Sequence, residues 1–185
     1  MEILGRRAVS RRRGLTLLLL LISLVPLRVT SLGQVATEYQ VKAAYIYNFT
    51  KFIEWPQAIV TPAFTICILG DDPFESAIDR LTAGKTAYGH PIQVRRPKNE
   101  AETKQCQMVF VGAADRSKAV KLIEVTQGSP VFTVGESQEF LRIGGMVILS
   151  MEGNLVKVTV NKAPTESAGF KVSANLMTLA KIYKP

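Results

Sequence analysis

Short apolar runs alternate with helical segments along most of this chain, and this order constrains the fold more than any other feature. Strands are expected at 64–69, 92–95, 107–111 and 131–134. Helices are expected after the first strand, at about 117–125 and at 137–141. Strands that alternate with helices predict βαβ units and a mostly parallel sheet flanked by helices. The sequence therefore predicts a single α/β domain.

The segment after the first strand carries the strongest local signal for the start of a helix. Asp72 is a good N-cap, and Pro73 suits the first helical position. Glu75 stands three residues after the cap, as in a capping box. This pattern predicts a helix that begins after Asp72 and runs to about Leu81.

Two apolar runs near the C-terminus flank a turn. Residues 146–151 and 155–160 surround Glu152-Gly153-Asn154, after a break at Gly144-Gly145. This arrangement predicts an antiparallel β-hairpin at the edge of the sheet.

A last helix is expected at about 173–183. Val172, Leu176, Leu179 and Ala180 fall on one of its faces at helical spacing. That face is expected to be the apolar one.

Residues 39–56, YQVKAAYIYNFTKFIEWP, hold six of the fourteen aromatic residues of the chain. Apolar side chains recur there at helical spacing: Val41, Ala44, Tyr45, Phe49, Phe52 and Ile53. Lys42, Asn48 and Lys51 fall on other faces, and Trp55-Pro56 ends the helix because a residue before proline avoids the helical region. The interleaved charges argue against a membrane span. The spacing favours a core helix over a ligand-binding aromatic box.

The first 33 residues have the composition of an export signal. Five arginines precede an apolar run at 15–27, and Ser31 and Gly33 suit a cleavage site. That run has 13 residues, whereas a membrane-spanning helix needs roughly 20. We expect a signal peptide at 1–33 and an exported domain at 34–185. For this leader a Sec signal is preferred, with a twin-arginine signal and an uncleaved anchor as alternatives.

The positive charge of the chain lies mainly in that leader. The net charge is +8, but the first 33 residues contain six Arg and one Glu. Residues 34–185 therefore carry 17 basic and 14 acidic side chains. A protein that binds nucleic acid usually has a basic stripe with stacking aromatics. We expect no nucleic-acid partner.

The residue types offer little for catalysis or metal binding. The chain has one histidine, His90, and two cysteines far apart, which is too few for a cluster of metal ligands. His90 is the only candidate acid–base group that titrates near neutral pH, and no nucleophile elbow or phosphate-binding glycine motif is present. Asp71 and Asp72 follow a strand, as in a metal pocket, but helix capping explains them more simply. We expect no catalytic residue, no metal and no cofactor.

The two cysteines lie in or beside expected strands. Cys67 belongs to the first strand and Cys106 directly precedes the third, and such strands are commonly neighbours in doubly wound sheets. Export places both in an oxidising compartment, where disulfides form. We therefore predict a Cys67–Cys106 disulfide, with two buried free thiols as the alternative. The bond would be structural. A more specific hypothesis is that the bond is redox-sensitive and that its reduction loosens the domain.

Five segments, taken in order from residue 38 to 182, resemble the YfiR-like family of exported regulators. The first helix carries most of the resemblance, through Lys42, Asn48, Phe49 and Trp55-Pro56. We expect these motif residues to serve in the core rather than in a binding site. The other segments are Cys67-Ile68-Leu69-Gly70, Cys106 with Val109-Phe110-Val111, Gly135-Glu136-Ser137 with Gly144-Gly145-Met146, and Ala168-Gly169-Phe170-Lys171-Val172-Ser173.

The resemblance implies a periplasmic α/β protein, often a homodimer, that keeps an inner-membrane diguanylate cyclase inactive by binding its periplasmic sensor region. It also implies a fold-supporting disulfide at Cys67 and Cys106, and an outer-membrane lipoprotein as a second partner. Two features depart from the family pattern. The chain lacks the second cysteine pair of some members, and Lys162-Ala163-Pro164-Thr165 replaces a more alanine-rich helix start.

Three functions follow as hypotheses. The first is a non-catalytic periplasmic repressor of cyclic di-GMP signalling, which agrees with the resemblance and with the lack of catalytic groups. The second is a periplasmic small-molecule sensor, with its ligand at the carboxyl ends of the strands near Gly70, Gly112 and Gly135. The third is an exported enzyme that depends on His90.

Overall fold

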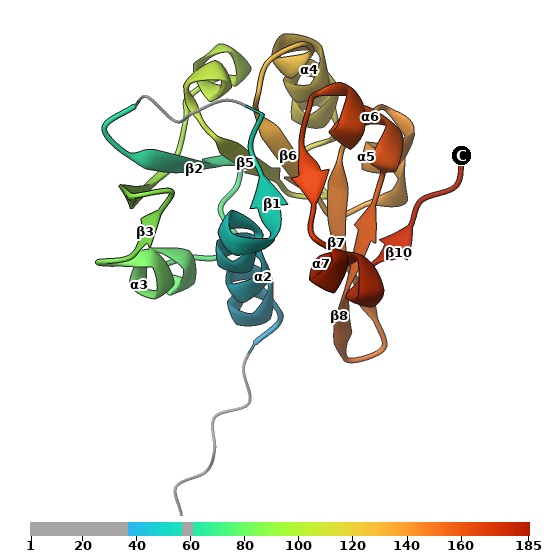
Figure 1. Cartoon of the computed structure of the whole chain (residues 1–185), viewed down its shortest axis with the longest axis horizontal. Helices are drawn as coiled ribbons and strands as arrows, with labels where there is room; N and C mark the ends of the chain where they lie inside the picture. Colours follow the sequence, from blue (N-terminus) through green and yellow to red (C-terminus); the bar gives the residue numbers. More distant parts are fainter. Residues whose placement is uncertain (1–36, 57–60) are drawn as a thin grey trace, which may run out of the picture. The chain divides into compact units, whose positions relative to one another are not determined.

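An eight-stranded sheet forms the centre of the fold, in the order β10-β8-β7-β6-β5-β2-β4-β3 (Figure 1). The computed structural model describes residues 37–56 and 61–185, so the expected leader at 1–33 lies outside the described residues. The strands are β2 Phe64–Leu69, β3 Thr86–Ala87, β4 His90–Arg95, β5 Met108–Val111, β6 Phe132–Gly135, β7 Val147–Glu152, β8 Leu155–Val160 and β10 Lys181–Ile182. A separate pair joins β1 Ile53–Glu54 to β9 Lys171–Val172.

The helices account for most of the remaining chain. They are α2 Glu38–Phe52, α3 Ala77–Thr82, α4 Arg116–Thr126, α5 Gln138–Arg142, α6 Lys162–Ser167 and α7 Ala174–Leu179, with a 3-10 helix, η2, at Glu100–Gln105. In the described part of the chain, no helix is both long and apolar enough to cross a membrane.

The sheet has the predicted mixed topology. Strands β4, β2, β5, β6 and β7 run parallel to one another. Strand β3 pairs with β4 in antiparallel fashion, and β7 and β8 form the predicted antiparallel hairpin. The two-residue strand β10 adds to β8 in parallel, outside the hairpin. The predicted α/β class, with a mostly parallel sheet flanked by helices, is confirmed.

Alternate residues of the central strands face two helical layers. On one face Ile66 of β2 and Phe110 of β5 join a core that includes residues of α2, α3 and α7. On the other face Cys67 and Val109 join residues of α4 and α5. Every residue of β2 is buried, as expected for a strand covered on both sides.

The predicted helix start at Asp72 is wrong. Helix α3 begins at Ala77, after Ser76. Asp72 instead accepts a hydrogen bond from the backbone N–H of Phe74 at 2.8 Å and pairs with Arg96 at 2.6 Å. Glu75 has a φ of 51°, which a first helical turn does not allow. The tertiary contact with Arg96 and the burial of Phe74 therefore override the local capping preference.

The first helix is confirmed, although its end and its buried face differ from the prediction. Thr37 and Gln40 form a capping box at its start. The helix ends at Phe52, because Ile53 and Glu54 pair with β9 before Trp55-Pro56 is reached. The buried residues are Lys42, Ala43, Ile46, Phe49 and Thr50. The buried stripe thus includes Lys42, which the apolar spacing had placed on another face.

The predicted last helix is too long. Helix α7 ends at Leu179, and Lys181 and Ile182 pair with Thr159 and Val160 of β8. Pairing with the sheet replaces the last helical turn. Leu176 is 4% exposed, but Leu179 is 76% exposed, so the expected apolar face is only partly covered.

Candidate functional site

A buried ion pair joins α2 to the loop that follows β6. Lys42 Nζ lies 2.5 Å from Glu136 Oε1, and the two side chains are 3% and 7% exposed. Glu38, one turn earlier on α2, lies 2.5 Å from the same ammonium. Glu136 Oε2 also accepts the backbone N–H of Ala113 at 2.9 Å. The N-terminal half of α2 is thereby fixed to the loops that follow β5 and β6.

The electrostatics of this cluster keep Lys42 charged. Burial by itself would lower the pKa of Lys42, because a desolvated ammonium is unfavourable. Hydrogen bonds to Glu136 and Glu38 outweigh burial, and the pKa of Lys42 lies above its usual value. Burial, together with the negative charge of Glu136, raises the pKa of the neighbouring Tyr39. A lysine held in its charged form serves as a structural tie rather than as a general base.

The carboxyl edge of the parallel strands is filled by side chains of the protein itself. A Cβ at Gly135 would lie 2.5 Å from Phe140 Cδ1, so the Phe140 ring occupies the space beside this backbone. A Cβ at Gly70 would overlap the carboxylate of Asp115. Asp115 also accepts the backbone N–H of Asp71 at 3.2 Å. These glycines therefore allow close packing within the protein.

The space that remains at this edge is small. Gly112 is less crowded, since a Cβ there would lie 3.6 Å from Glu136 Oε2. A cavity of about 190 Å³ opens beside it, with Arg116 and Glu139 in its lining. Pockets for drug-sized ligands commonly measure roughly 300–1,000 Å³. Of the three glycines of the expected crevice, Gly112 lines this cavity, which has room for little more than a very small ligand.

Trp55 lies in an aromatic cluster that connects the first helix with the sheet. Its ring centroid is 5.0 Å from that of Phe64, 5.6 Å from Tyr88, 5.9 Å from Phe132 and 5.5 Å from Phe170. Its indole N–H donates to the carbonyl oxygen of Gln107 at 3.2 Å. These contacts give Trp55 a packing role.

The other motif residues of the first helix are placed differently from one another. Phe49 is fully buried, Asn48 is half-buried and Pro56 is exposed. Pro56 lies against Gly169, where a Cβ would be 2.8 Å from Pro56 Cβ. Of the five motif residues, Lys42 is the one that enters a charged cluster.

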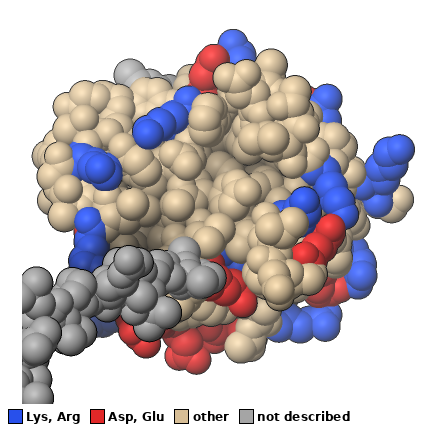
Figure 2. Space-filling view, turned by 90° about the horizontal axis from the view of Figure 1, so that it is seen from below, with Lys and Arg blue, Asp and Glu red and all other residues tan. Residues whose placement is uncertain are grey.

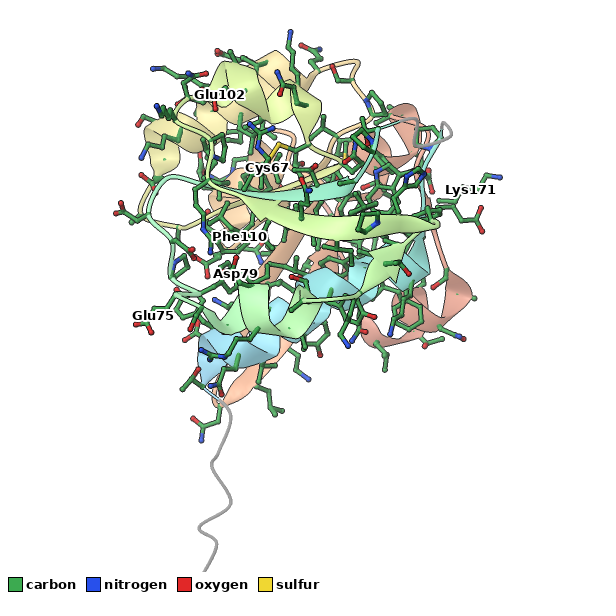
Figure 3. The ribbon with its side chains drawn as sticks, turned by 90° about the vertical axis from the view of Figure 1, so that its left-hand side faces the viewer. Cys67, Glu75, Asp79, Glu102, Phe110 and Lys171 are labelled. Carbon is green, nitrogen blue, oxygen red and sulfur yellow. A yellow bond between two sulfur atoms is a disulfide. The ribbon has the colours of Figure 1, made fainter. Side chains whose placement is uncertain are left out.

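The predicted disulfide is present. Cys67 in β2 and Cys106, directly after η2, are bonded, with their Cα atoms 6.0 Å apart. Both are buried, at 1% and 2% exposure, on the side of the sheet that α4 covers. Figure 3 shows the sulfur bond at Cys67 between the sheet and the helical layer. The bond ties the segment before β5 to β2.

The structure does not bring the remaining candidates for catalysis or metal binding together in one site. His90 begins β4 and is half-exposed. Within residues 37–56 and 61–185, no group of three or more His, Cys, Asp or Glu side chains is placed to hold a metal ion.

The outer surface of α2 and α7 is largely uncharged (Figure 2). Tyr45, Phe52 and Leu179 line a small, mainly apolar cavity of about 120 Å³ there. Exposed apolar surface of this kind often marks a site of protein interaction. Other exposed large apolar side chains are Tyr88, Met151, Leu155 and Ile182.

Sequence reasoning missed Glu136 and Arg96 as partners of charged residues. Glu136 lies in Gly135-Glu136-Ser137, one of the segments that carry the family resemblance. That resemblance was the signal in the sequence that could have pointed to Glu136. Arg96 pairs with Asp72 and Asp79, both at 2.6 Å, and nothing in its sequence neighbourhood indicates this.

Two solved structures share the fold at low sequence identity. One is the ABC domain in complex with L-Trp from Streptococcus pneumoniae, with a TM-score of 0.51 and 10% identity. The other is a conserved domain protein from Vibrio cholerae O1 biovar El Tor, with a TM-score of 0.51 and 12% identity. Each match covers 79% of this chain and 60% of the other, so this chain spans about three fifths of their length. Such likeness concerns the fold alone.

The sequence comparisons are more specific. No curated protein matches the sequence. The model of the YfiR/HmsC-like family matches residues 39–181, which is most of the chain and nearly all of the described fold. The protein therefore belongs to the YfiR/HmsC-like family.

Proposed function

We propose that this protein is a non-catalytic periplasmic repressor that binds the periplasmic sensor region of an inner-membrane diguanylate cyclase. The observation that carries the proposal is the family match over residues 39–181. YfiR-like proteins are periplasmic regulators of diguanylate cyclase signalling that act through a protein partner. In this proposal residues 1–33 direct export and are removed, and residues 34–185 are the regulatory domain.

Repression would follow from a difference in affinity. A regulator that binds the inactive state of the cyclase more tightly than the active state shifts the equilibrium toward the inactive state. The size of the shift is set by the ratio of the two affinities. The proposed regulator needs no reacting group, which agrees with the structural role of Lys42 and the half-exposed position of His90.

The features of the surface support a protein partner more than a small substrate. The uncharged face of α2 and α7, which includes the exposed Leu179, offers apolar area for association. In contrast, the cavity near Gly112 measures only about 190 Å³, which weakens the alternative of a small-molecule sensor that uses the carboxyl edge. A homodimer and an outer-membrane lipoprotein partner belong to the same proposal.

The disulfide gives the repressor a route to redox control. Reduction would remove the covalent link between Cys106 and Cys67 of β2, and backbone contacts such as that from Gln107 N–H to the carbonyl of Thr65 would then hold this segment alone. Loosening of this side of the sheet would reduce the fraction of protein that is competent to bind. Affinity for the cyclase would then fall under reducing conditions.

The test is a pull-down from solubilised inner membrane with purified residues 34–185, with and without reductant, read by mass spectrometry. Recovery of a diguanylate cyclase with and without reductant supports repression but not redox control. Recovery only without reductant supports repression and redox control together. Recovered cyclase is then purified, and its activity is measured with increasing amounts of the regulator. Failure of folded protein to recover a cyclase, or to lower its activity, counts against the proposal.

A further inference from the structure

A third cavity, of about 410 Å³, opens between the helical layer and the starts of β6 and β7. Its lining includes Thr133 near the start of β6 and Met146 directly before β7. These positions lie at the amino ends of the two strands, away from the crevice near Gly112. The volume falls within the range of roughly 300–1,000 Å³ that small-ligand pockets occupy.

Three helices end at this cavity. The C-cap residues of α4, α5 and α6 are Gln127, Ile143 and Ala168, and all three belong to the lining. The last carbonyl groups of a helix lack intrahelical donors and carry partial negative charge. The 11-residue α4 contributes the longest of the three helices. Other N–H groups of the chain already donate to the last carbonyls of the short helices α5 and α6, among them those of Leu141 and Glu166. The end of α4 is therefore the helix end that makes the cavity favourable for positive charge.

Glu124 adds a formal negative charge. It lies in the last turn of α4 and is the one charged side chain among the residues that line the cavity. A carboxylate beside the carboxyl end of a helix is locally unfavourable unless a cation neutralises it. No basic side chain is among the lining residues, so no lysine or arginine of the lining would compete with a bound cation for Glu124.

The wall and floor of the cavity are mainly apolar. Ile123, Ile143 and Met146 supply apolar side chains, and the hydroxyl groups of two lining threonines are already engaged. Thr126 Oγ1 donates to the carbonyl of Leu122 at 2.7 Å, and Thr133 Oγ1 accepts the N–H of Met146 at 3.2 Å. With these polar atoms satisfied internally, the floor offers contact area for an apolar group.

Gly144 keeps one wall open. Its φ is +105°, a value that residues with a side chain rarely adopt. A Cβ at this position would lie 3.4 Å from Ile123 Cγ2. A glycine at the turn after α5 thus leaves the space between α4 and α5 free.

We propose that this cavity binds a small organic cation, consisting of an ammonium group and an apolar body. The ammonium lies by Glu124 and the carboxyl end of α4, and the apolar body contacts Ile123, Ile143 and Met146. The lining shares no residue with the cavity on the uncharged face of α2 and α7, so the ligand makes no direct contact with a partner bound there. The inference is independent of the identity of any protein partner.

The test compares three probes of similar shape and different charge: phenethylamine, 3-phenylpropanol and 3-phenylpropionate. Binding to the exported protein is followed by backbone amide NMR shifts, with Gly128 and Gly144 as reporters within the cavity. We expect saturable shifts of these two amides with phenethylamine at up to about 10 mM, and weaker binding of the alcohol and the carboxylate. The absence of saturable shifts with the amine, or equal binding of all three probes, overturns the proposal.

Two matched variants test the role of charge. Glu124→Gln removes the carboxylate of the lining, and Glu166→Gln removes an exposed carboxylate on α6 that is not in the lining. We expect the first to weaken phenethylamine binding about threefold to tenfold and the second to leave it nearly unchanged. Equal effects of the two substitutions would contradict the proposal. Ser167→Tyr, at an exposed position of the lining, should fill the opening and abolish binding of the amine.

Discussion

Lys42 and Glu136 form a buried ion pair across 94 residues of sequence, with Nζ and Oε1 2.5 Å apart. The pair joins the first helix to the loop after β6, and the backbone of Ala113 joins it through Glu136. It fixes α2, which forms part of the uncharged face, against the carboxyl ends of the central strands. The stability of that face should therefore depend on this pair.

Removal of one partner of the pair should destabilise the fold strongly. Lys42→Met leaves the carboxylate of Glu136 buried without its counter-charge, which typically costs about 3–5 kcal/mol. The double variant Lys42→Met with Glu136→Gln should recover much of the loss, because the buried carboxylate is gone and Glu38, which is 37% exposed, keeps access to water. Urea unfolding measures both. Lys51→Met, at an exposed position of the same helix, is the control, and a Lys42→Met variant as stable as this control would contradict the account.

Loss of the disulfide should lower the free energy of unfolding by about 4 kcal/mol, because the bond closes a loop with a sequence separation of 39 residues. The Cys67→Ala, Cys106→Ala double variant and the reduced wild-type protein should show similar losses in urea unfolding. Addition of reductant to the double variant should change nothing. A loss of less than about 1 kcal/mol would show that the bond contributes little to the fold.

Acid should weaken the fold partly through Asp79. A hydrogen bond from Arg96 is the main cause that holds the pKa of Asp79 below its usual value, and the charge of Arg96 adds to it. A carboxyl whose pKa is lowered on folding stabilises the native state above its unfolded pKa of about 3.9. That contribution is lost as the pH falls through the lower, folded pKa.

Arg96→Gln should therefore lose less stability than the wild type between pH 7 and acid conditions below about pH 4. Urea midpoints at both pH values measure the difference. Arg80→Gln is the matched control, because Arg80 lies on α3 and its guanidinium contacts Ser76 rather than a carboxylate. If Arg96→Gln shows the pH dependence of the wild type, Asp79 does not contribute as described.

Two glycines at the carboxyl edge should respond differently to the same substitution. Gly135→Ala places a methyl group 2.5 Å from the buried ring of Phe140 and should cost about 1–3 kcal/mol through overpacking. Gly112→Ala meets its nearest neighbour at 3.6 Å, an ordinary contact, and should be nearly neutral. Thermal or urea unfolding compares the two variants. Equal effects would mean that Phe140 does not occupy the edge as the structure places it.

The sequence was sufficient for the architecture because the signals for the sheet are local. Runs such as Phe64–Leu69 are apolar throughout, as a strand covered on both faces requires, and the helices between them enforce parallel neighbours. The disulfide followed from the expected adjacency of the strands at Cys67 and Cys106. Each of these inferences needed only the order of elements along the chain.

The errors arose where distant contacts decide the local structure. Asp72 has the sequence signature of an N-cap, but Arg96 lies 24 residues away and draws its carboxylate into an ion pair. The last helix stops at Leu179 because Lys181 and Ile182 find partners in β8. The apolar spacing placed Lys42 outside the apolar stripe of the first helix, because periodicity carries no information about a counter-charge such as Glu136.

The most direct test of the central claim is the level of cyclic di-GMP in host cells that lack the gene. A periplasmic repressor predicts a rise on deletion, reversed by the full chain but not by residues 34–185 produced without the leader. The rise should also disappear when the cyclase recovered in the pull-down is deleted. An unchanged or lower level of cyclic di-GMP in the deletion strain would contradict the claim.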